Sequence, residues 1–307
     1  MTIIICITAI YLTNFLVEIL PQYQATKKIV PIFAGGGTRL PAHVGILKAL
    51  NEFNVEFDHL VGVSGGSIVS SLYASGLSIS EIKHIALETD YNKFREFSLL
   101  KLIRNGGLSS GDVFEQWVDR LLQGKTFAEL DKNLHIVATD VKKGSPVIFD
   151  KEHTPNVKVS MAVRFSMSIP LVFSFKPFGK HLMVDGSILS EDALHRDWAQ
   201  NGTPVLCFRL RGEYEYDELK VNGFFPIFNY ITLLIRTFMT TISREYINDA
   251  FWHNTIVINT GASSAVDFTM DARQKEELFI KGYQTARDIV PIKLGDSATS
   301  PVMERSN

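Results

Sequence analysis

Two glycine-rich turns near the start of the chain constrain its fold more than any other feature. Residues 29–34 predict a buried strand that runs into three glycines, and residues 41–53 predict a helix with one apolar face. Residues 60–63 predict a second short strand that leads into Ser64, and the small residues over 68–75 predict the next helix. This order predicts a parallel βαβ unit whose two turns meet at the carboxyl ends of the strands.

The remaining pattern extends this unit into one α/β domain. A long final helix is predicted over 271–290, where apolar residues recur on one face. A short helix is predicted over 160–166, and strands are predicted over 134–139, 147–149, 181–184, 205–210 and 255–258. We therefore expect a three-layer α/β/α fold with a central, mostly parallel sheet. The stretch from Gly106 to Gly111 has the composition of a linker, and we expect a mobile loop there.

Composition and charge exclude several classes of protein. The chain of 307 residues is 46% hydrophobic and 21% charged, which is typical of a globular protein with a packed core. The formal net charge is -2 and no run of Lys and Arg is longer than two, so binding to a nucleic-acid polymer is excluded. Cys6 and Cys207 are too few for a disulfide framework and are not spaced like metal ligands. We expect a reducing compartment, no metal and no cofactor, while the oligomeric state stays open.

Two apolar segments indicate contact with a membrane. Residues 1–28 are mostly apolar and are predicted to form a membrane anchor or an interfacial helix. The alternatives are a helix packed on the domain, or a start codon placed upstream of the true one. Residues 223–239 predict an interfacial helix, a lid or a core helix. The domain is predicted over 29–295, followed by a disordered polar tail over 296–307. The predicted location is cytoplasmic, peripheral to the membrane or anchored at it.

The second glycine-rich turn matches the pattern of a nucleophile elbow. Gly62-Val63-Ser64-Gly65-Gly66 fits G-x-S-x-G, a sharp strand-to-helix turn that presents a serine hydroxyl above a sheet. Glycines are needed beside the serine because a Cβ would clash in so tight a bend. A plain glycine-rich turn is the alternative. The apolar strand before it and the small-residue helix after it favour a nucleophilic serine.

The first turn offers donors for the oxyanion that forms in acyl transfer. Gly35, Gly36 and Gly37 present backbone N–H groups without side chains, and Arg39 leads into the following helix. Each such donor stabilises the transition state by on the order of 3 kcal/mol, and the N–H of Gly65 is expected to join them. A phosphate-binding loop is the rival interpretation. This turn lacks both the G-K-[ST] ending of a P-loop and the glycine spacing of a dinucleotide fingerprint.

The base expected for the serine is a carboxylate. Asp185 ends the predicted strand 181–184 and begins Asp185-Gly186-Ser187, so its side chain should lie at the same edge of the sheet as the two turns. The eight histidines offer no obvious partner for the serine, and His43 lies on the buried face of its helix. An aspartate that caps a turn is the alternative interpretation of Asp185.

Together these motifs resemble those of the bacterial patatin-like phospholipases, in the same order, from about residue 29 to 210. The family's motifs G-G-G-x-[KR]-G, G-x-S-x-G and D-G-[GA] correspond to Gly35 through Arg39, Gly62 through Gly66, and Asp185-Gly186 with Ser187 third. Residues 138–140 and 162–170 also look like family segments. The first motif fails at Leu40, and this departure puts the loop conformation in question because leucine does not readily adopt a positive φ.

The resemblance implies an activity. In the family the serine is the nucleophile, the aspartate is the base without a histidine, and acyl esters of phospholipids or neutral lipids are cleaved. A lipid substrate in a membrane is therefore expected. Some bacterial members are effectors of anti-phage defence that a cyclic nucleotide activates, and the loop over 106–111 is where such a gate is expected here.

Two other functions stay open at this stage. An α/β-hydrolase would complete a triad with His195 or His253, although its elbow would follow more strands than the two found here. A catalytically degenerate patatin fold would serve as a lipid-binding module, but the intact serine, aspartate and glycine loop argue against it. Turnover of generic esters separates the enzyme from the module.

Overall fold

The computed structural model describes residues 27–96, 98–189, 196–212, 230, 234, 237 and 253–295. The strands are β1 Val30–Ala34, β2 His59–Val63, β3 Gly107–Ser109, β4 Asn133–Asp140, β5 Ser145–Phe149, β6 Leu171–Phe173, β7 Lys176–Phe178, β8 His181–Val184, β9 Val205–Arg211 and β10 Thr255–Asn259. The α-helices are α2 Leu40–Glu52, α3 Gly65–Ala74, α4 Ile79–Glu88, α5 Leu99–Asn105, α6 Asp112–Leu121, α7 Val159–Ser166 and α10 Ala272–Lys293.

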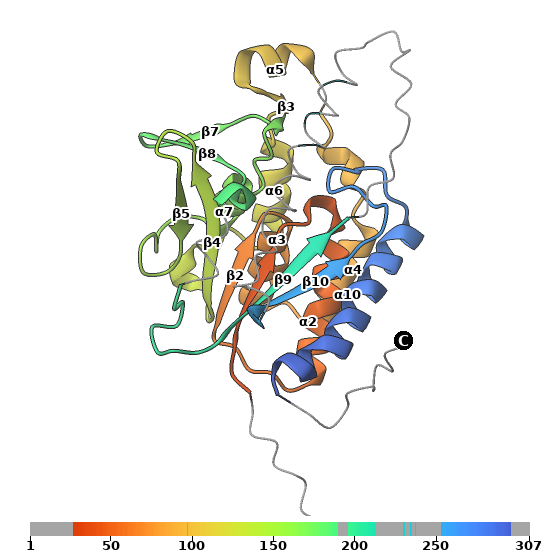
Figure 1. Ribbon diagram of the computed structural model, residues 1–307. Helices are drawn as coiled ribbons and strands as arrows, with labels where there is room; N and C mark the ends of the chain where they lie inside the picture. The colour runs from red at the N-terminus through yellow and green to blue at the C-terminus, as the bar shows by residue number, and fades with distance from the viewer. Residues whose placement is uncertain are drawn as a thin grey trace, which may run out of the picture.

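One mixed sheet organises the molecule (Figure 1). Its strands lie in the order β10-β9-β1-β2-β4-β8-β7, and β5 pairs with β4 outside this path. The five strands β10, β9, β1, β2 and β4 are parallel, whereas β5 and β8 run antiparallel to β4. The predicted α/β fold with a central, mostly parallel sheet is confirmed. All of the strands and helices predicted within the described residues are present, with small differences at their ends.

The central strand β1 accommodates a proline. Pro31 lacks an N–H group, and in the middle of a sheet this would remove a hydrogen bond from the ladder. The pairing of β1 with β2 begins only at Ile32, opposite Val61, so Pro31 lies before that ladder starts. On its other side β1 pairs with β9 along its whole length.

Helices α2 and α10 pack closely on each other because each has a glycine at the contact. A Cβ at Gly45 of α2 would lie 2.1 Å from the carbonyl oxygen of Phe279, and a Cβ at Gly282 of α10 would lie 2.0 Å from that of Ala42. The two backbones therefore touch where larger residues would separate them. This contact holds the C-terminal helix against the first βαβ unit.

The stretch from Gly106 to Gly111, predicted as a mobile loop, is ordered structure. It contains β3, which is buried and pairs in parallel with β6. A Cβ at Gly107 would lie 2.1 Å from the backbone nitrogen of Ser174, and the Arg164 guanidinium donates to the carbonyl of Ser110 at 2.6 Å. The glycines here allow close approach of chain segments, and the prediction of a loop over this stretch was wrong because residues 107–109 form a strand.

Several predictions fall on parts of the chain that the structure does not describe. Residues 1–26 of the N-terminal segment, most of 223–239, His195 and the tail over 296–307 lie outside the described residues. Within the described part of the chain, each helix is too short or too polar to cross a bilayer.

Candidate active site

Ser64 stands in a strained turn between β2 and α3. Its φ of 52° and ψ of -128° place a non-glycine residue in a region that side chains disfavour. The turn is tight on both sides, because a Cβ at Gly62 would lie 2.6 Å from Cα of Ser67 and one at Gly66 would lie 2.0 Å from the carbonyl oxygen of Phe33. The two flanking glycines therefore have the steric role that the motif predicts.

The predicted base and the predicted nucleophile are in direct contact. The hydroxyl of Ser64 donates to Oδ2 of Asp185 at 2.8 Å, although the two residues are 121 positions apart. The backbone N–H of Ser187 donates to the other oxygen, Oδ1, at 2.8 Å. Gly186, between Asp185 and Ser187 in the chain, must be a glycine, since a Cβ there would lie 2.0 Å from the carbonyl oxygen of Val137.

Burial makes Asp185 an unusually strong base for a carboxylate. Its side chain is 1% exposed, and burial raises its pKa from 3.8 to about 6. Hydrogen bonds from Ser187 and Ser64 favour the charged form but do not cancel this effect. Asp185 is therefore mostly ionised at neutral pH and holds a transferred proton more firmly than an exposed aspartate does.

The glycine loop after β1 lies against the beginning of α3. Gly35, Gly36 and Gly37 have φ values of 72°, 108° and 54°, all in the region that favours glycine. A Cβ at Gly65 would lie 2.6 Å from the backbone nitrogen of Gly37. Among the described residues, the N–H groups of Gly36 and Gly37 donate to no backbone carbonyl.

Two buried side chains hold this loop in place. The N–H of the Arg39 backbone and the Nε of its side chain both donate to the carbonyl of Gly36, at 2.9 and 3.2 Å. His43 Nε2 donates to the carbonyl of Gly35 at 3.0 Å, which fixes the proton on that nitrogen. Burial, assisted by the charge of Arg39, lowers the pKa of His43 to about 4, so the ring is neutral.

Leu40 does not distort the loop. It stands where the family motif has glycine, but its φ of -52° and ψ of -25° are helical and it joins the first turn of α2. A positive φ is needed only in the three glycines before it. The departure from the motif therefore introduces no backbone strain.

Two residues that sequence reasoning did not assign complete the surroundings of Ser64. The Ser166 hydroxyl accepts the N–H of Ser64 at 2.8 Å and donates to the carbonyl of Val137 at 2.6 Å, so it ties the elbow to β4. The sulfur of Met167 lies 3.6 Å from the Ser64 hydroxyl. Both belong to the segment 162–170 that resembles the family, which was the only available signal.

An apolar cavity of about 20 Å³ is separated from the Ser64 hydroxyl by Met167, which lines the cavity and lies 3.6 Å from that hydroxyl. Gly37 and Met167 form part of its wall near the serine. The rest of the wall is apolar and mostly aromatic, and includes Tyr91, Phe94, Phe114, Trp117, Phe173 and Phe268. This volume is about that of one water molecule, so a longer apolar group enters only when side chains move aside.

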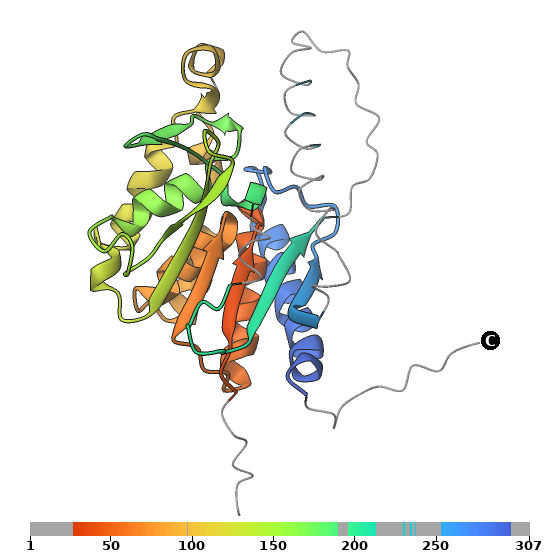
Figure 2. The same cartoon turned by 60° about the vertical axis from the view of Figure 1, so that its left-hand side comes forward.

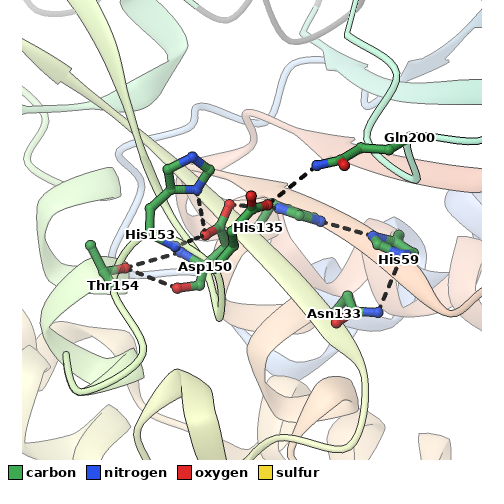
Figure 3. Close-up of polar contacts among 8 residues, drawn as sticks. His59, Asn133, His135, Asp150, His153, Thr154 and Gln200 are labelled. Atoms are coloured by element: carbon green, nitrogen blue, oxygen red, sulfur yellow. Dashed lines mark hydrogen bonds and ion pairs between the residues drawn. The ribbon is translucent and has the colours of Figure 1, made fainter.

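Three histidines, His59, His135 and His153, form a cluster with Asp150 (Figure 3). His59 at the start of β2 bonds to His135 at 3.1 Å between ring nitrogens, and His135 bonds to Asp150 at 3.1 Å. His153 bonds to the other oxygen of Asp150 at 2.8 Å. His253 is exposed at the start of β10. No described histidine donates to or accepts from Ser64 or Asp185.

On this fold, a strained strand-to-helix serine that donates to a buried carboxylate is the arrangement expected of a serine acyl hydrolase. Residues 32–195 match the sequence profile of the family described as patatin-like phospholipase. The chain belongs to the patatin-like phospholipase family.

Relatives come from a virus, from bacteria and from animals. An uncharacterized protein of Acanthamoeba polyphaga mimivirus is 30% identical over 278 residues, which are 85% of this chain and 93% of that protein. An uncharacterized NTE family protein of Mycobacterium tuberculosis is 30% identical over 194 residues, 61% of this chain but only 31% of the relative. The chain thus spans about a third of the mycobacterial protein. A bacterial subgroup within the family, as predicted, is not supported by these matches.

Among solved structures, VipD from Legionella pneumophila has a similar fold. Its TM-score is 0.60 at 15% sequence identity, and the match covers 91% of this chain and 73% of VipD. At this identity the match concerns the fold alone.

Proposed function

We propose that this protein cleaves acyl esters of membrane lipids through a dyad of Ser64 and Asp185. The observation that carries the proposal is the hydrogen bond of 2.8 Å from the serine hydroxyl to the buried carboxylate. A serine hydroxyl is a poor nucleophile at neutral pH and needs a group within hydrogen-bond reach to accept its proton. Asp185 is the group that meets this requirement.

Attack begins when the Ser64 oxygen forms a bond to the ester carbonyl carbon and its proton passes to Oδ2 of Asp185. The raised pKa of about 6 makes this transfer easier than it would be for an ordinary aspartate. The tetrahedral intermediate then expels the alcohol, which takes the proton from Asp185. A water molecule next attacks the acyl-serine and gives its proton to Asp185, and the fatty acid leaves as Ser64 recovers its hydrogen.

The negative charge on the carbonyl oxygen is held by backbone donors. We assign this role to the N–H groups of Gly36, Gly37 and Gly65, which lie on the loop and at the start of α3. The N–H of Gly35 already donates to the carbonyl of Val63 at 3.1 Å. Gly35 and Arg39, also predicted for the oxyanion site, are therefore assigned to holding the loop. Fixed donors need no reorganisation during reaction, which is why they stabilise a transition state well.

The acyl chain of the substrate is assigned to the apolar cavity. Its wall combines Met167, whose sulfur is 3.6 Å from the reactive hydroxyl, with aromatic side chains that favour a hydrocarbon over a charged group. Methionine is unbranched and adapts to irregular space, so Met167 can move aside as the chain enters.

The test is release of fatty acid from phospholipid vesicles, followed by mass spectrometry of the products. We expect turnover by the unaltered protein and none above background with Ser64→Ala. Ser71→Ala is the matched control, because Ser71 is a buried serine of α3, the helix that follows Ser64, and its hydroxyl donates to the carbonyl of Ile68. Equal turnover by Ser64→Ala would overturn the proposal, and no turnover by any form would favour a lipid-binding module instead.

Regulation and membrane location form a separate part of the proposal. We infer an anti-phage role that a cyclic nucleotide activates, and this inference rests on the family resemblance alone. Residues 107–109 of the stretch where a gate was predicted form β3. Esterase activity that is low in the purified protein and rises with cyclic dinucleotides would support this role. Residues 1–24, Phe224 and Phe225 lie outside the described residues, and liposome sedimentation of a deletion and of Asp variants tests their predicted membrane contact.

A further inference from the structure

Three large apolar side chains are exposed together near the tip of α5. Leu100 and Ile103 on α5 are 73% and 75% exposed, and Phe175 between β6 and β7 is 45% exposed. Phe175 packs against the end of α5, since a Cβ at Gly106 would lie 2.5 Å from its ring. We call these three residues the apolar crest. Figures 1 and 2 show α5 projecting from the body of the molecule, beyond β3.

The fold of α5 does not require the crest residues to be apolar. Leu102 packs against the main core, whereas Leu100 and Ile103 are three residues apart and share the face that points to solvent. A surface helix normally carries polar residues on that face. Ser98 caps the helix at its beginning and Gly106 ends it, so the local structure is held without these two side chains.

Exposed basic side chains accompany the crest. Arg104 is on α5, Lys142 and Lys143 are in the turn after β4, and Lys180 is in the turn between β7 and β8. Lys142 donates to the carbonyl of Lys180 at 3.3 Å, so the two turns are neighbours.

The nearby carboxylates are largely neutralised by partners. Glu96 pairs with Lys101 at 2.8 Å, and Asp140 is buried against His181. Lys176 is shared between Glu115 and the exposed Asp112. The exposed Arg104, Lys142, Lys143 and Lys180 therefore give this end of the molecule more exposed basic than acidic side chains.

The crest lies on the same edge of the sheet as Ser64. β4 runs parallel to β2, so the end of β4 and the elbow after β2 lie at the same end of the sheet. Asp140 at the end of β4 pairs with Met183, and Met183 pairs with Lys176, the residue after Phe175. The cavity wall continues into the crest: Phe94 accepts a hydrogen bond from Ser109 of β3, and Phe173 lines the cavity two residues before Phe175. A surface that contacts the crest therefore lies at the end of the sheet that carries Ser64 and the cavity.

We propose that the apolar crest inserts into a bilayer that contains anionic lipid. Leu100, Ile103 and Phe175 enter the boundary between headgroups and acyl chains, and the basic side chains meet the lipid phosphates. This contact orients the cavity toward the membrane. The benefit of that orientation rests on the proposed function, whereas binding of the crest to the bilayer does not.

The test is flotation of the full chain with vesicles of phosphatidylcholine alone or mixed with phosphatidylglycerol. We expect Leu100→Gln with Ile103→Gln to lower the partition coefficient on mixed vesicles by at least about tenfold, because two aliphatic side chains no longer leave water. Lys142→Gln with Lys143→Gln should remove most of the preference for phosphatidylglycerol. The matched control is Ile280→Gln with Ile292→Gln, which changes two exposed isoleucines on α10.

Each variant is also assayed on a soluble short-chain ester, which reports the fold and the chemistry without a membrane. Crest variants that hydrolyse this ester normally but float less support the inference. Crest variants that float as well as the unaltered protein overturn it. If flotation is unchanged and light scattering shows a changed oligomeric state, the crest is assigned to contact between copies of the chain. If the unaltered protein does not hydrolyse the ester, this result contradicts the proposed function instead.

Discussion

Asp185 and Asp150 are both buried aspartates that follow strands of the same sheet, yet their surroundings shift their pKa values in opposite directions. Asp185 is 1% exposed and Asp150 is 4% exposed. Burial raises the pKa of Asp185 to about 6, with few hydrogen bonds to oppose it. Burial acts on Asp150 in the same sense, but hydrogen bonds from His135 and His153 outweigh it and hold the pKa of Asp150 well below its usual range.

The comparison shows how contact with histidine changes the basicity of a buried aspartate; no described histidine contacts Ser64 or Asp185. A carboxylate bonded to two imidazoles is a poor proton acceptor, and it serves to orient its partners. A carboxylate bonded to one serine and one backbone N–H keeps its basicity. The same residue type is thus structural beside histidines and suited to proton transfer without them.

The largest expected effect is on turnover. Asp185→Asn removes the proposed proton acceptor and should lower kcat/KM by about two to four orders of magnitude, which is the usual contribution of a positioned base. Asp150→Asn should change kcat/KM by less than about threefold, because Asp150 does not contact the site. Steady-state kinetics on a soluble ester compare the two.

The double variant Ser64→Ala with Asp185→Asn should be scarcely worse than either single variant, because the two groups act as a unit. His195→Ala and His253→Ala should keep most of the activity. A folded histidine variant as inactive as Ser64→Ala would replace the dyad by a hydrolase triad.

The next effect is on stability. Asp150→Asn and Asp185→Asn should change the free energy of unfolding in opposite directions. Asp150→Asn weakens charge-assisted bonds to two histidines and should lower the free energy of unfolding by about 1–3 kcal/mol. Asp185→Asn removes a buried charge and should raise the free energy of unfolding at pH 7 by about 1–2 kcal/mol. Urea denaturation at pH 7 measures both, and two changes of equal sign would contradict the comparison.

The stabilisation by Asp185→Asn should depend on pH. The folded pKa of Asp185 is raised, so its charge destabilises the fold above about pH 6 and this penalty fades as the pH falls toward 3.8. The advantage of the asparagine variant over the unaltered protein should therefore shrink between pH 7 and pH 4. An advantage that stays constant over this range would mean that Asp185 ionises like an exposed aspartate.

The smallest effect concerns His59. Burial and the neighbouring His135 lower its pKa below 6.5, so the folded state takes up its proton less readily than the unfolded chain. Its contribution to stability is complete above pH 6.5 and is lost as the pH falls toward the folded pKa. His59→Asn should flatten the pH dependence of Tm in this window. Its effect on the free energy of unfolding should be smaller than the one expected for Asp150→Asn. An unchanged slope would mean that the contact with His135 does not control this proton.

Part of this site could be predicted because its signals are local. The glycines around Ser64 and the glycine loop after β1 mark tight turns within a few residues, and the apolar strands before them place both turns at one edge. Asp185 was found by the same reasoning, from a strand end and a glycine. These are backbone constraints that a residue pattern expresses directly.

Other features depend on contacts between distant segments and have no local signal. The bond from Ser64 to Ser166 joins residues 102 positions apart, and the pair of His59 and His135 joins residues 76 positions apart. The glycines over 106–111 were misjudged because glycine permits both mobility and close packing, and only the neighbours, here Ser174 and Arg164, decide between them.

The most direct test of the central claim is the rate at which a fluorophosphonate ester labels the protein as a function of pH, with the labelled residue located by peptide mass spectrometry. Labelling needs an activated serine but no bound membrane, so it isolates proton transfer from Ser64 to Asp185. The account predicts one adduct, on Ser64, with a rate that falls as the pH drops through about 6, where Asp185 becomes protonated. Labelling at another residue, or labelling of Asp185→Asn at the rate and pH dependence of the unaltered protein, would contradict it.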